Sequence, residues 1–166
     1  MPKPILALIT GGTFDKEYNL ITGELYFNDT HLPEMFDLGR ANVPITVRTL
    51  MMIDSLQMTL EDRQLILNNC SRCEFNNIII THGTDTMVET AKLIAAANLN
   101  KTIVLVGAMI PYKFGMSSDG FFNLGAAIAY AQSLPVGVYI AMHGDFFHWD
   151  NVFKNRKTGY FERLRD

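Results

Sequence analysis

The sequence predicts an α/β fold in which helices cover both faces of a doubly wound, mainly parallel sheet. Short apolar runs alternate with segments of helical periodicity along the 166 residues. The apolar runs are nearly continuous, which is typical of strands buried on both faces. Strands that alternate with helices form right-handed βαβ units, and a chain of this length forms one domain.

Five apolar runs are the predicted strands: residues 5–9, 45–50, 77–81, 102–106 and 136–142. Three of the intervening segments are predicted helices. The first begins at Thr59, whose hydroxyl can cap it. The second follows Thr86-Met-Val-Glu89, which has the capping-box pattern, and the third spans Asp119 to Gln132 and is rich in Ala and Leu.

The segment from Phe14 to Leu32 has no clear periodicity. It is polar, contains Gly23 and follows the first predicted strand directly. Long irregular segments inside compact domains are usually functional or disordered. We therefore expect a flexible loop over the edge of the sheet, with Asp15 and Glu17 as solvated charges.

Charge and hydropathy argue against two classes of partner. The chain carries 14 basic and 17 acidic residues, a net charge of −3. Because the body is acidic and has no nucleic-acid motif, we interpret the basic residues near the end of the chain as a solvated strip and expect no nucleic-acid partner. No apolar run reaches the roughly 18 residues of a membrane span, and residues 4–9 are too short for a secretory signal, so a cytoplasmic protein without membrane contact is expected. The strip consists of Lys154, Arg156, Lys157, Arg163 and Arg165.

Cysteine and histidine spacing predicts neither a metal nor a cofactor. Cys70 and Cys73 form a single C-x-x-C without a second pair, and the four histidines have no zinc-binding spacing. We interpret the two cysteines as ordinary thiols at a helix end. A zinc or redox site is the less favoured alternative.

Two hydroxyl-rich turns lie where ligands bind in such sheets, beyond the carboxyl ends of the strands. Thr10-Gly-Gly-Thr13 follows the first strand, and Thr81-His-Gly-Thr-Asp-Thr86 follows the third. The first turn matches neither a dinucleotide-binding nor a P-loop motif. Two threonines and an aspartate without a metal cluster suggest a hydroxyl nucleophile acting on a carbonyl. Taken singly, these turns also fit a tight turn and a helix cap.

These motifs resemble the amino-terminal domain of the bacterial-type L-asparaginase/glutaminase family. Residues 10–13 are similar to its first signature, and residues 80–90 are similar to its second without interruption. Further matches follow in order along the chain: Asp54-Ser55 with Met58-Thr59, Gly107-Ala-Met109 before Pro111, Ser118-Asp-Gly120 with Phe122-Asn-Leu124, and Val152 with Lys154.

The resemblance implies a catalytic set of five residues. Thr13 would be the nucleophile and Tyr18 its hydrogen-bonding partner. Thr84 and Lys154 would pair as a second threonine and its base, and Asp85 would hold the α-ammonium group of the substrate. A zwitterionic amide needs one such anion and several donors at fixed positions.

The resemblance also implies which residues line the substrate site. Ser55 and nearby backbone N–H groups would bind the α-carboxylate. Gly12 and Gly83 would allow backbone N–H groups to face the developing oxyanion. The implied substrate-binding positions are Gly12, Ser55, Leu56, Gly83, Thr84, Asp85, Ala108 and Met109.

Several features depart from the family's pattern. Full-length relatives have a second domain, which from a neighbouring subunit completes the pocket around the ammonium group, and we expect it to be absent here. Leu56, Gln57 and Ile110 stand where relatives usually carry a polar residue, an aspartate and an arginine. We therefore expect retained chemistry with weakened substrate recognition.

None of the histidines is assigned a catalytic role. His82 precedes a glycine turn, and we interpret it as structural. His143, His148 and Trp149 are expected near the end of the last strand, where they could line a pocket wall.

Together these observations predict one flavodoxin-like α/β domain over residues 1–166. The expected function is hydrolysis of the side-chain amide of L-asparagine, or of a related small amide, to acid and ammonia through a threonine acyl-enzyme. A homo-oligomer, at least a dimer, is expected. Two alternatives stay open: a non-catalytic member that binds an amino acid or a protein, and hydrolysis of a bulkier amide.

Overall fold

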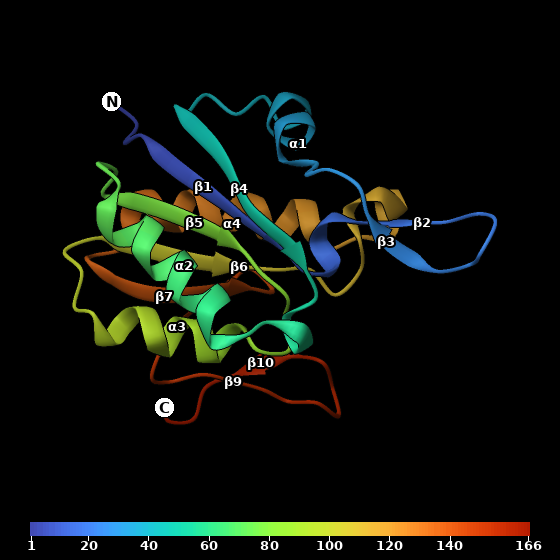
Figure 1. The fold of residues 1–166 in the computed structure, drawn as a ribbon. Coiled ribbons are helices and arrows are strands. Elements are labelled where there is room, and N and C mark those ends of the chain that lie inside the picture. Colours follow the sequence, from blue (N-terminus) through green and yellow to red (C-terminus); the bar gives the residue numbers. More distant parts are fainter.

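A six-stranded sheet forms the centre of the computed structural model, which describes residues 1–166 (Figure 1). The first five strands in its order run parallel, and β8 pairs antiparallel with β7 at one edge. The prediction of a doubly wound, mainly parallel sheet is confirmed. The strand order is β4 (Ile45–Ile53), β1 (Ile5–Gly11), β5 (Asn77–Thr81), β6 (Thr102–Val106), β7 (Gly137–Met142) and β8 (Asp145–His148).

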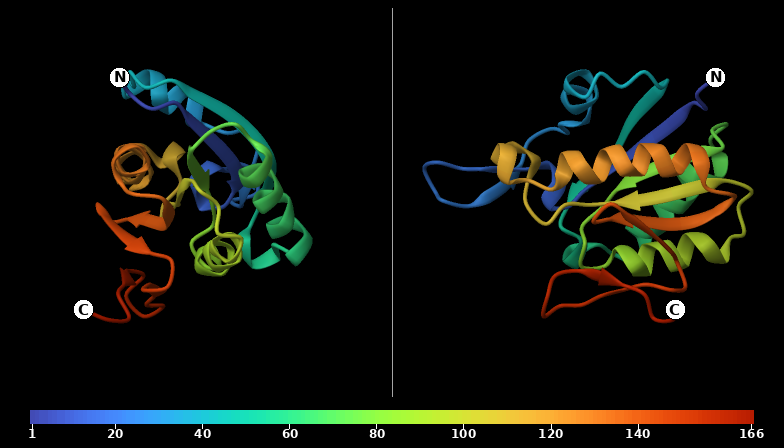
Figure 2. Two further views of the ribbon diagram at one scale, coloured as in Figure 1. Left: turned by 90° about the vertical axis from the view of Figure 1, so that its left-hand side faces the viewer. Right: turned by 180° about the vertical axis from the view of Figure 1, so that it is seen from behind.

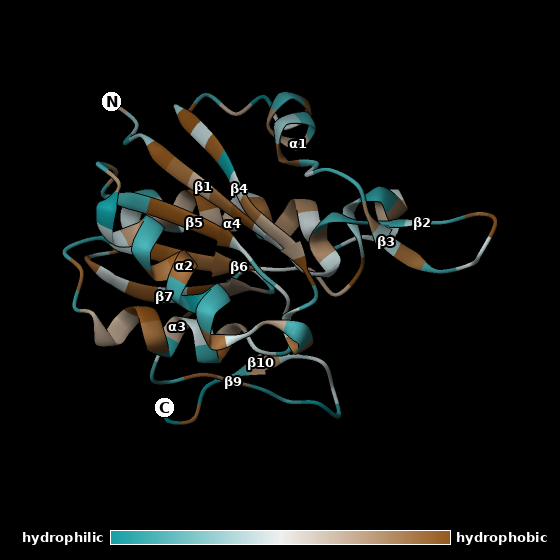
Figure 3. Ribbon diagram, in the orientation of Figure 1, coloured by the Kyte–Doolittle hydropathy of each residue, from teal (hydrophilic) through white to brown (hydrophobic).

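Helices cover both faces of this sheet (Figure 2). On β1, Leu6 and Leu8 point into the core beneath α2 (Leu60–Arg72) and α3 (Met87–Ala96), whereas Ile5, Ala7 and Ile9 point toward the opposite core. Both faces of the central strands are therefore apolar, which Figure 3 shows as brown arrows. This pattern explains why the strands read as continuous apolar runs. The second core is covered by α1 (Leu32–Leu38) and α4 (Gly120–Ser133).

The two predicted helix caps have different outcomes. Thr59 forms a full capping box: its Oγ1 accepts the Asp62 N–H at 3.2 Å, and the Asp62 carboxylate accepts the Thr59 N–H at 2.8 Å. The capping box predicted at Thr86 is wrong, because the Thr86 hydroxyl instead donates to the Ser55 carbonyl at 2.9 Å. A tertiary contact has replaced the local one.

The segment after β1 is ordered, so the prediction of an irregular loop is wrong. Residues Thr13–Asp15 form a 3₁₀ turn, and β2 (Lys16–Tyr18) pairs antiparallel with β3 (Leu25–Phe27) in a hairpin that projects from the sheet (Figure 1). Strands of three residues leave too little sequence for an alternating pattern to be recognised.

The prediction that Asp15 is a solvated charge is also wrong. Its side chain is fully buried, and its Oδ1 accepts the His31 N–H at 2.9 Å. Burial raises the pKa of this carboxyl above its ordinary value. Glu17 is partly buried, with its Oε1 3.6 Å from Nε2 of His31. Asp15 thereby ties the turn that carries Thr13 to the start of α1.

The last residues of the chain are not a free solvated strip, as the sequence had suggested. They fold back below α3 through a pair of short strands, β9 (Phe153–Lys154) and β10 (Phe161–Glu162) (Figures 1 and 2). Arg163 pairs with Asp145 at 2.6 Å, and Arg165 pairs with Asp150 at 3.3 Å. Paired carboxylates on the body therefore hold this segment in place.

The two cysteines are free thiols at the end of α2. Cys70 is buried, and burial raises its pKa to about 12. Cys73 caps the helix, with its carbonyl accepting a hydrogen bond from Lys101 Nζ at 2.6 Å. No three His, Cys, Asp or Glu side chains converge as metal ligands would. None of the helices has the length and apolarity required to cross a membrane.

Candidate active site

The two hydroxyl-rich turns meet at the carboxyl edge of the sheet, where β1 and β5 lie side by side. The chain leaves β1 for β4 on one side and returns to β5 on the other, so this is the topological switch point of the sheet. Ligand crevices form at such points. The turns that carry Thr13 and Thr84 follow these two strands directly.

Glycines allow three segments to touch at the switch point. A Cβ on Gly12, which has a φ of 76°, would collide with the backbone of Gly83, and a Cβ on Gly83 would collide with Ser55. No other residue fits such close approach. The glycines of the two signatures therefore bring the turns after β1 and β5 together with residue 55.

Ser55 is held from several sides. It begins a 3₁₀ turn capped by Asp54, which accepts the Leu56 N–H at 3.0 Å and the ammonium of Lys16 at 2.8 Å. The hydrogen bond from Lys16 holds the pKa of Asp54 below its ordinary value. Ser55 itself is buried, whereas Leu56 is exposed. The position of Ser55 is thus fixed before any ligand arrives.

The structure brings Thr84, Asp85 and Lys154 into contact. Lys154 Nζ donates to Thr84 Oγ1 at 2.8 Å and to Asp85 Oδ1 at 2.8 Å. The lysine comes from β9, 70 residues from Thr84 along the chain, and its side chain is only 12% exposed. The three side chains therefore lie in contact, as predicted. Their catalytic roles stay a prediction.

The predicted contact between Thr13 and Tyr18 is not formed. Thr13 is partly buried at the edge, and its hydroxyl makes no hydrogen bond within the protein. Tyr18 lies at the far end of β2, where its ring packs edge-on against Phe114 and its hydroxyl lies beside Gly23 in the hairpin turn. Pairing of β2 with β3 carries Tyr18 outward, so its proposed role requires the side chain to move.

Backbone donors are available on one side of the site. The N–H groups of Gly83, Thr84 and Asp85 donate to no acceptor in the protein, and they precede α3. Successive unpaired backbone N–H groups in a turn favour anions. The N–H of Gly12 itself donates to the Ile53 carbonyl at 2.9 Å, so this group is already used within the protein.

Asp119 organises the third segment of the site, and sequence reasoning assigned it no role. Its carboxylate accepts the N–H groups of Met109 at 2.9 Å and Ile110 at 3.0 Å, and it also binds Asn123 at 3.0 Å. The backbone N–H of Met109 is therefore already used, and Ala108 is buried. The match at residues 118–120 was the signal that pointed to this residue.

The interpretation of His82 as a structural residue is confirmed. It is fully buried, and burial lowers its pKa to about 4. Because a carbonyl only accepts, Nδ1 donates to the Gly83 carbonyl at 2.8 Å, and Nε2 accepts the Thr90 hydroxyl at 2.7 Å. His82 thus fixes the orientation of the peptide that precedes Thr84.

The expectation that His148 and Trp149 line the crevice is wrong. β8 runs antiparallel to β7, so it carries both residues back to the amino edge of the sheet, where they border a hollow with Val138. His143 does stay at the carboxyl edge, but its Nε2 accepts the Phe161 N–H at 3.0 Å. It therefore anchors the final segment of the chain.

A doubly wound sheet with hydroxyl, amine and carboxylate groups at its switch point defines an α/β domain with a polar site for a small ligand. The family model described as "Asparaginase, N-terminal" matches residues 4–161, and the chain belongs to this family. The resemblance seen in the sequence is confirmed.

Relatives and solved structures agree with this family. L-asparaginase 1 of Escherichia coli (strain K12) is 32% identical over 168 residues, which cover 95% of this chain and 49% of the relative. The thermostable L-asparaginase of Thermococcus kodakarensis superposes with a TM-score of 0.86 at 26% identity, over 98% of this chain and 52% of that one. A glutaminase-asparaginase of Acinetobacter glutaminasificans is 42% identical over 83 residues, 48% of this chain and 25% of the relative. The chain spans about half the length of relatives that it matches along nearly its whole length.

Proposed function

We propose that this domain hydrolyses the side-chain amide of L-asparagine, or of a related small amide, to the acid and ammonia. The contact of Lys154 Nζ with both Thr84 and Asp85, at 2.8 Å each, is the observation that carries the proposal. An amine, a hydroxyl and a carboxylate within hydrogen-bond distance are the groups that acyl transfer requires. Family membership supports the same reaction.

In the proposed mechanism Thr13 is the nucleophile. Its hydroxyl oxygen attacks the amide carbon, and the C–N bond breaks. The proton lost by the hydroxyl is delivered to the leaving nitrogen, so that ammonia departs and an ester forms on Thr13. A water molecule then attacks the ester and releases the acid. The unpaired N–H groups of residues 83–85 would stabilise the oxyanion. Tyr18 would reach Thr13 only after leaving Gly23.

Thr84 and Lys154 serve proton transfer in this proposal. Lys154 is the base for the Thr84 hydroxyl, with which it already shares a hydrogen bond. Asp85 would bind the substrate on the side away from Lys154. Its Oδ2 accepts no hydrogen bond within the protein and is open to a ligand, since both partners of this carboxylate bind Oδ1.

Ammonia release from asparagine and from glutamine tests the proposal. The wild-type protein should release ammonia, and Thr13→Ala should lose turnover while retaining substrate binding, because a nucleophile acts mainly in the transition state. Thr49→Ala, on the exposed edge strand β4, is the matched control and should keep full turnover. Binding without ammonia release would favour the non-catalytic alternative.

We also propose that the chain self-associates, at least as a dimer. Several apolar side chains beside the site are exposed and support this proposal. Light scattering should give a mass above 18.7 kDa that holds on dilution. A monomer across a wide concentration range would contradict it. The exposed side chains are Met109, Ile110, Phe114 and Met116.

A further inference from the structure

Asp85 is bound by two basic side chains of the final segment, not by one. Besides Lys154, Arg156 reaches it with both ends of its guanidinium group: NH1 donates to Oδ1 at 3.1 Å and NH2 donates to the Asp85 carbonyl at 3.2 Å. The fork of a guanidinium favours such two-point contacts. Arg156 is thus seated on the residue proposed to receive the α-ammonium group of the substrate.

The other two carboxylates of the site, Asp54 and Asp119, already have partners of their own. Asp54 is paired with Lys16 at 2.8 Å, and Asp119 is occupied by two backbone N–H groups and Asn123. The unpaired N–H groups of residues 83–85 add further positive potential. The single negative charge of Asp85 is therefore shared by two basic side chains, Lys154 and Arg156.

We propose that Arg156 is a specificity-determining residue that holds a positive charge beside the ammonium position at Asp85, so that the site selects amides that carry a carboxylate but no free α-ammonium group. This inference rests on the proposed amide hydrolysis. The substrate class is the half-amides of dicarboxylic acids and their N-acylated amino-acid counterparts.

The physical reason is the charge that an incoming substrate meets. An α-ammonium group would share Asp85 with a guanidinium that is always charged, and like charges in close contact are unfavourable. A substrate with hydrogen or an acylated nitrogen at that position avoids this repulsion. Its carboxylate still has Ser55, the residue that we expect to bind it.

Arg156 can be tested without disturbing the core. Its side chain is 65% exposed and acts only on Asp85. The neighbouring Lys157 is exposed and its side chain has no partner in the protein, so Lys157→Met is a matched control that removes the same charge one residue away. Arg156→Lys keeps the charge but loses the fork.

The experiment compares L-asparagine with succinamate, which has hydrogen in place of the α-ammonium group. Ammonia release gives kcat/KM for both amides in the wild type, Arg156→Met, Arg156→Lys and Lys157→Met. The wild type should prefer succinamate, and Arg156→Met should shift the ratio toward asparagine by about tenfold or more. Arg156→Lys should shift it less, and Lys157→Met should leave it unchanged.

A wild-type preference for asparagine, or an equal change for both amides in Arg156→Met, would overturn the inference. If neither amide is hydrolysed, the proposed function fails, and calorimetry with the products succinate and L-aspartate decides the inference separately. The inference is supported if the wild type binds succinate more tightly than L-aspartate and if Arg156→Met reduces this difference in affinity. Equal affinities, or no binding of either product, overturn it.

Discussion

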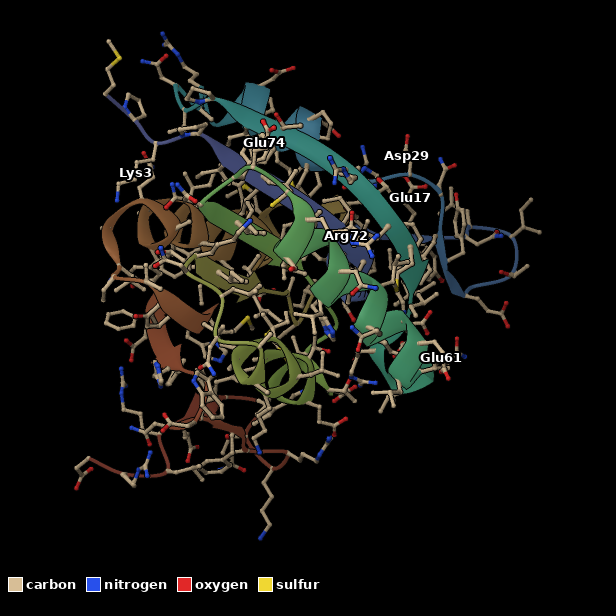
Figure 4. The ribbon with its side chains drawn as sticks, turned by 60° about the vertical axis from the view of Figure 1, so that its left-hand side comes forward. Lys3, Glu17, Asp29, Glu61, Arg72 and Glu74 are labelled. Atoms are coloured by element: carbon tan, nitrogen blue, oxygen red, sulfur yellow. The ribbon has the colours of Figure 1, made fainter.

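The amino edge of the central sheet has the hollows, whereas the carboxyl edge has the reactive side chains. A hollow of about 760 Å³ lies at the amino edge, and Figure 4 labels Lys3 and Glu74 on its rim. Two smaller hollows adjoin it and include Arg72 and Trp149. The carboxyl edge instead holds the contact of Lys154 with Thr84 and Asp85.

This difference has a physical cause. At the carboxyl edge the strands lead into turns and helix starts, where N–H groups stay unpaired and attract anions. At the amino edge the strands are entered from helix ends. The size of a hollow is therefore a poorer guide to function in this fold than the direction of its strands.

The largest expected effect compares one lysine from each edge. Lys154→Met should lower turnover by about a hundredfold or more, because it removes the proposed base. Lys101→Met, at the amino edge, removes hydrogen bonds to Cys73 and should leave turnover within about twofold. Steady-state ammonia release measures both. Equal losses of turnover in the two variants would contradict the assignment of the reaction to the carboxyl edge.

The next effect is the pH dependence of stability that arises from His82. Its pKa is lowered from 6.5 to about 4 in the folded protein, so the unfolded chain binds the proton first as the pH falls. The stabilisation is complete above pH 6.5 and is lost between pH 6.5 and 4, by about 3 kcal/mol in total.

Urea unfolding at several pH values measures this loss. His82→Gln should flatten the dependence in that window, whereas His148→Gln, at the exposed amino-edge histidine, should preserve it. A wild-type free energy of unfolding that stays constant between pH 7 and 4 would contradict the burial of a neutral His82.

The close packing at the carboxyl edge can be tested at Gly83. Gly83→Ala should destabilise the protein by about 2 kcal/mol, since its Cβ would collide with Ser55. Gly125→Ala, on the exposed face of α4 with nothing near its Cβ, should instead stabilise it by about 0.5–1 kcal/mol. Denaturant melts of the two variants should therefore shift in opposite directions, and a shift in the same direction refutes the close contact at the switch point.

The smallest effect is expected from the hollow at the amino edge. Asn100→Ala changes an exposed side chain on its lining and should alter kcat/KM for asparagine by less than about twofold. A tenfold loss would mean that this hollow takes part in the reaction.

Much of the site could be predicted from short stretches of sequence. The turns around Thr13 and Thr84 follow strands of continuous apolar residues, and strand order then places them together. The role of His82 followed from its position before a glycine. Such inferences succeed because they depend on local pattern and on general rules of βαβ topology.

Errors arose where a side chain had two possible partners. Thr86 had a local cap available and instead bonds Ser55, 31 residues away. Asp15 looked like a loop charge, and only the return of the chain at His31 buries it. His148 was misplaced because nothing in its sequence shows that the last strand of the sheet runs antiparallel.

By itself, the sequence determined the fold class, the two glycine–threonine turns and their shared edge, because backbone conformation and apolar periodicity are encoded residue by residue. Only the tertiary structure decided that Arg156 joins Lys154 on Asp85 and that Tyr18 stands apart from Thr13. Both depend on how the final segment and the hairpin pack, and such contacts between residues distant in sequence are selected by the free energy of the whole fold.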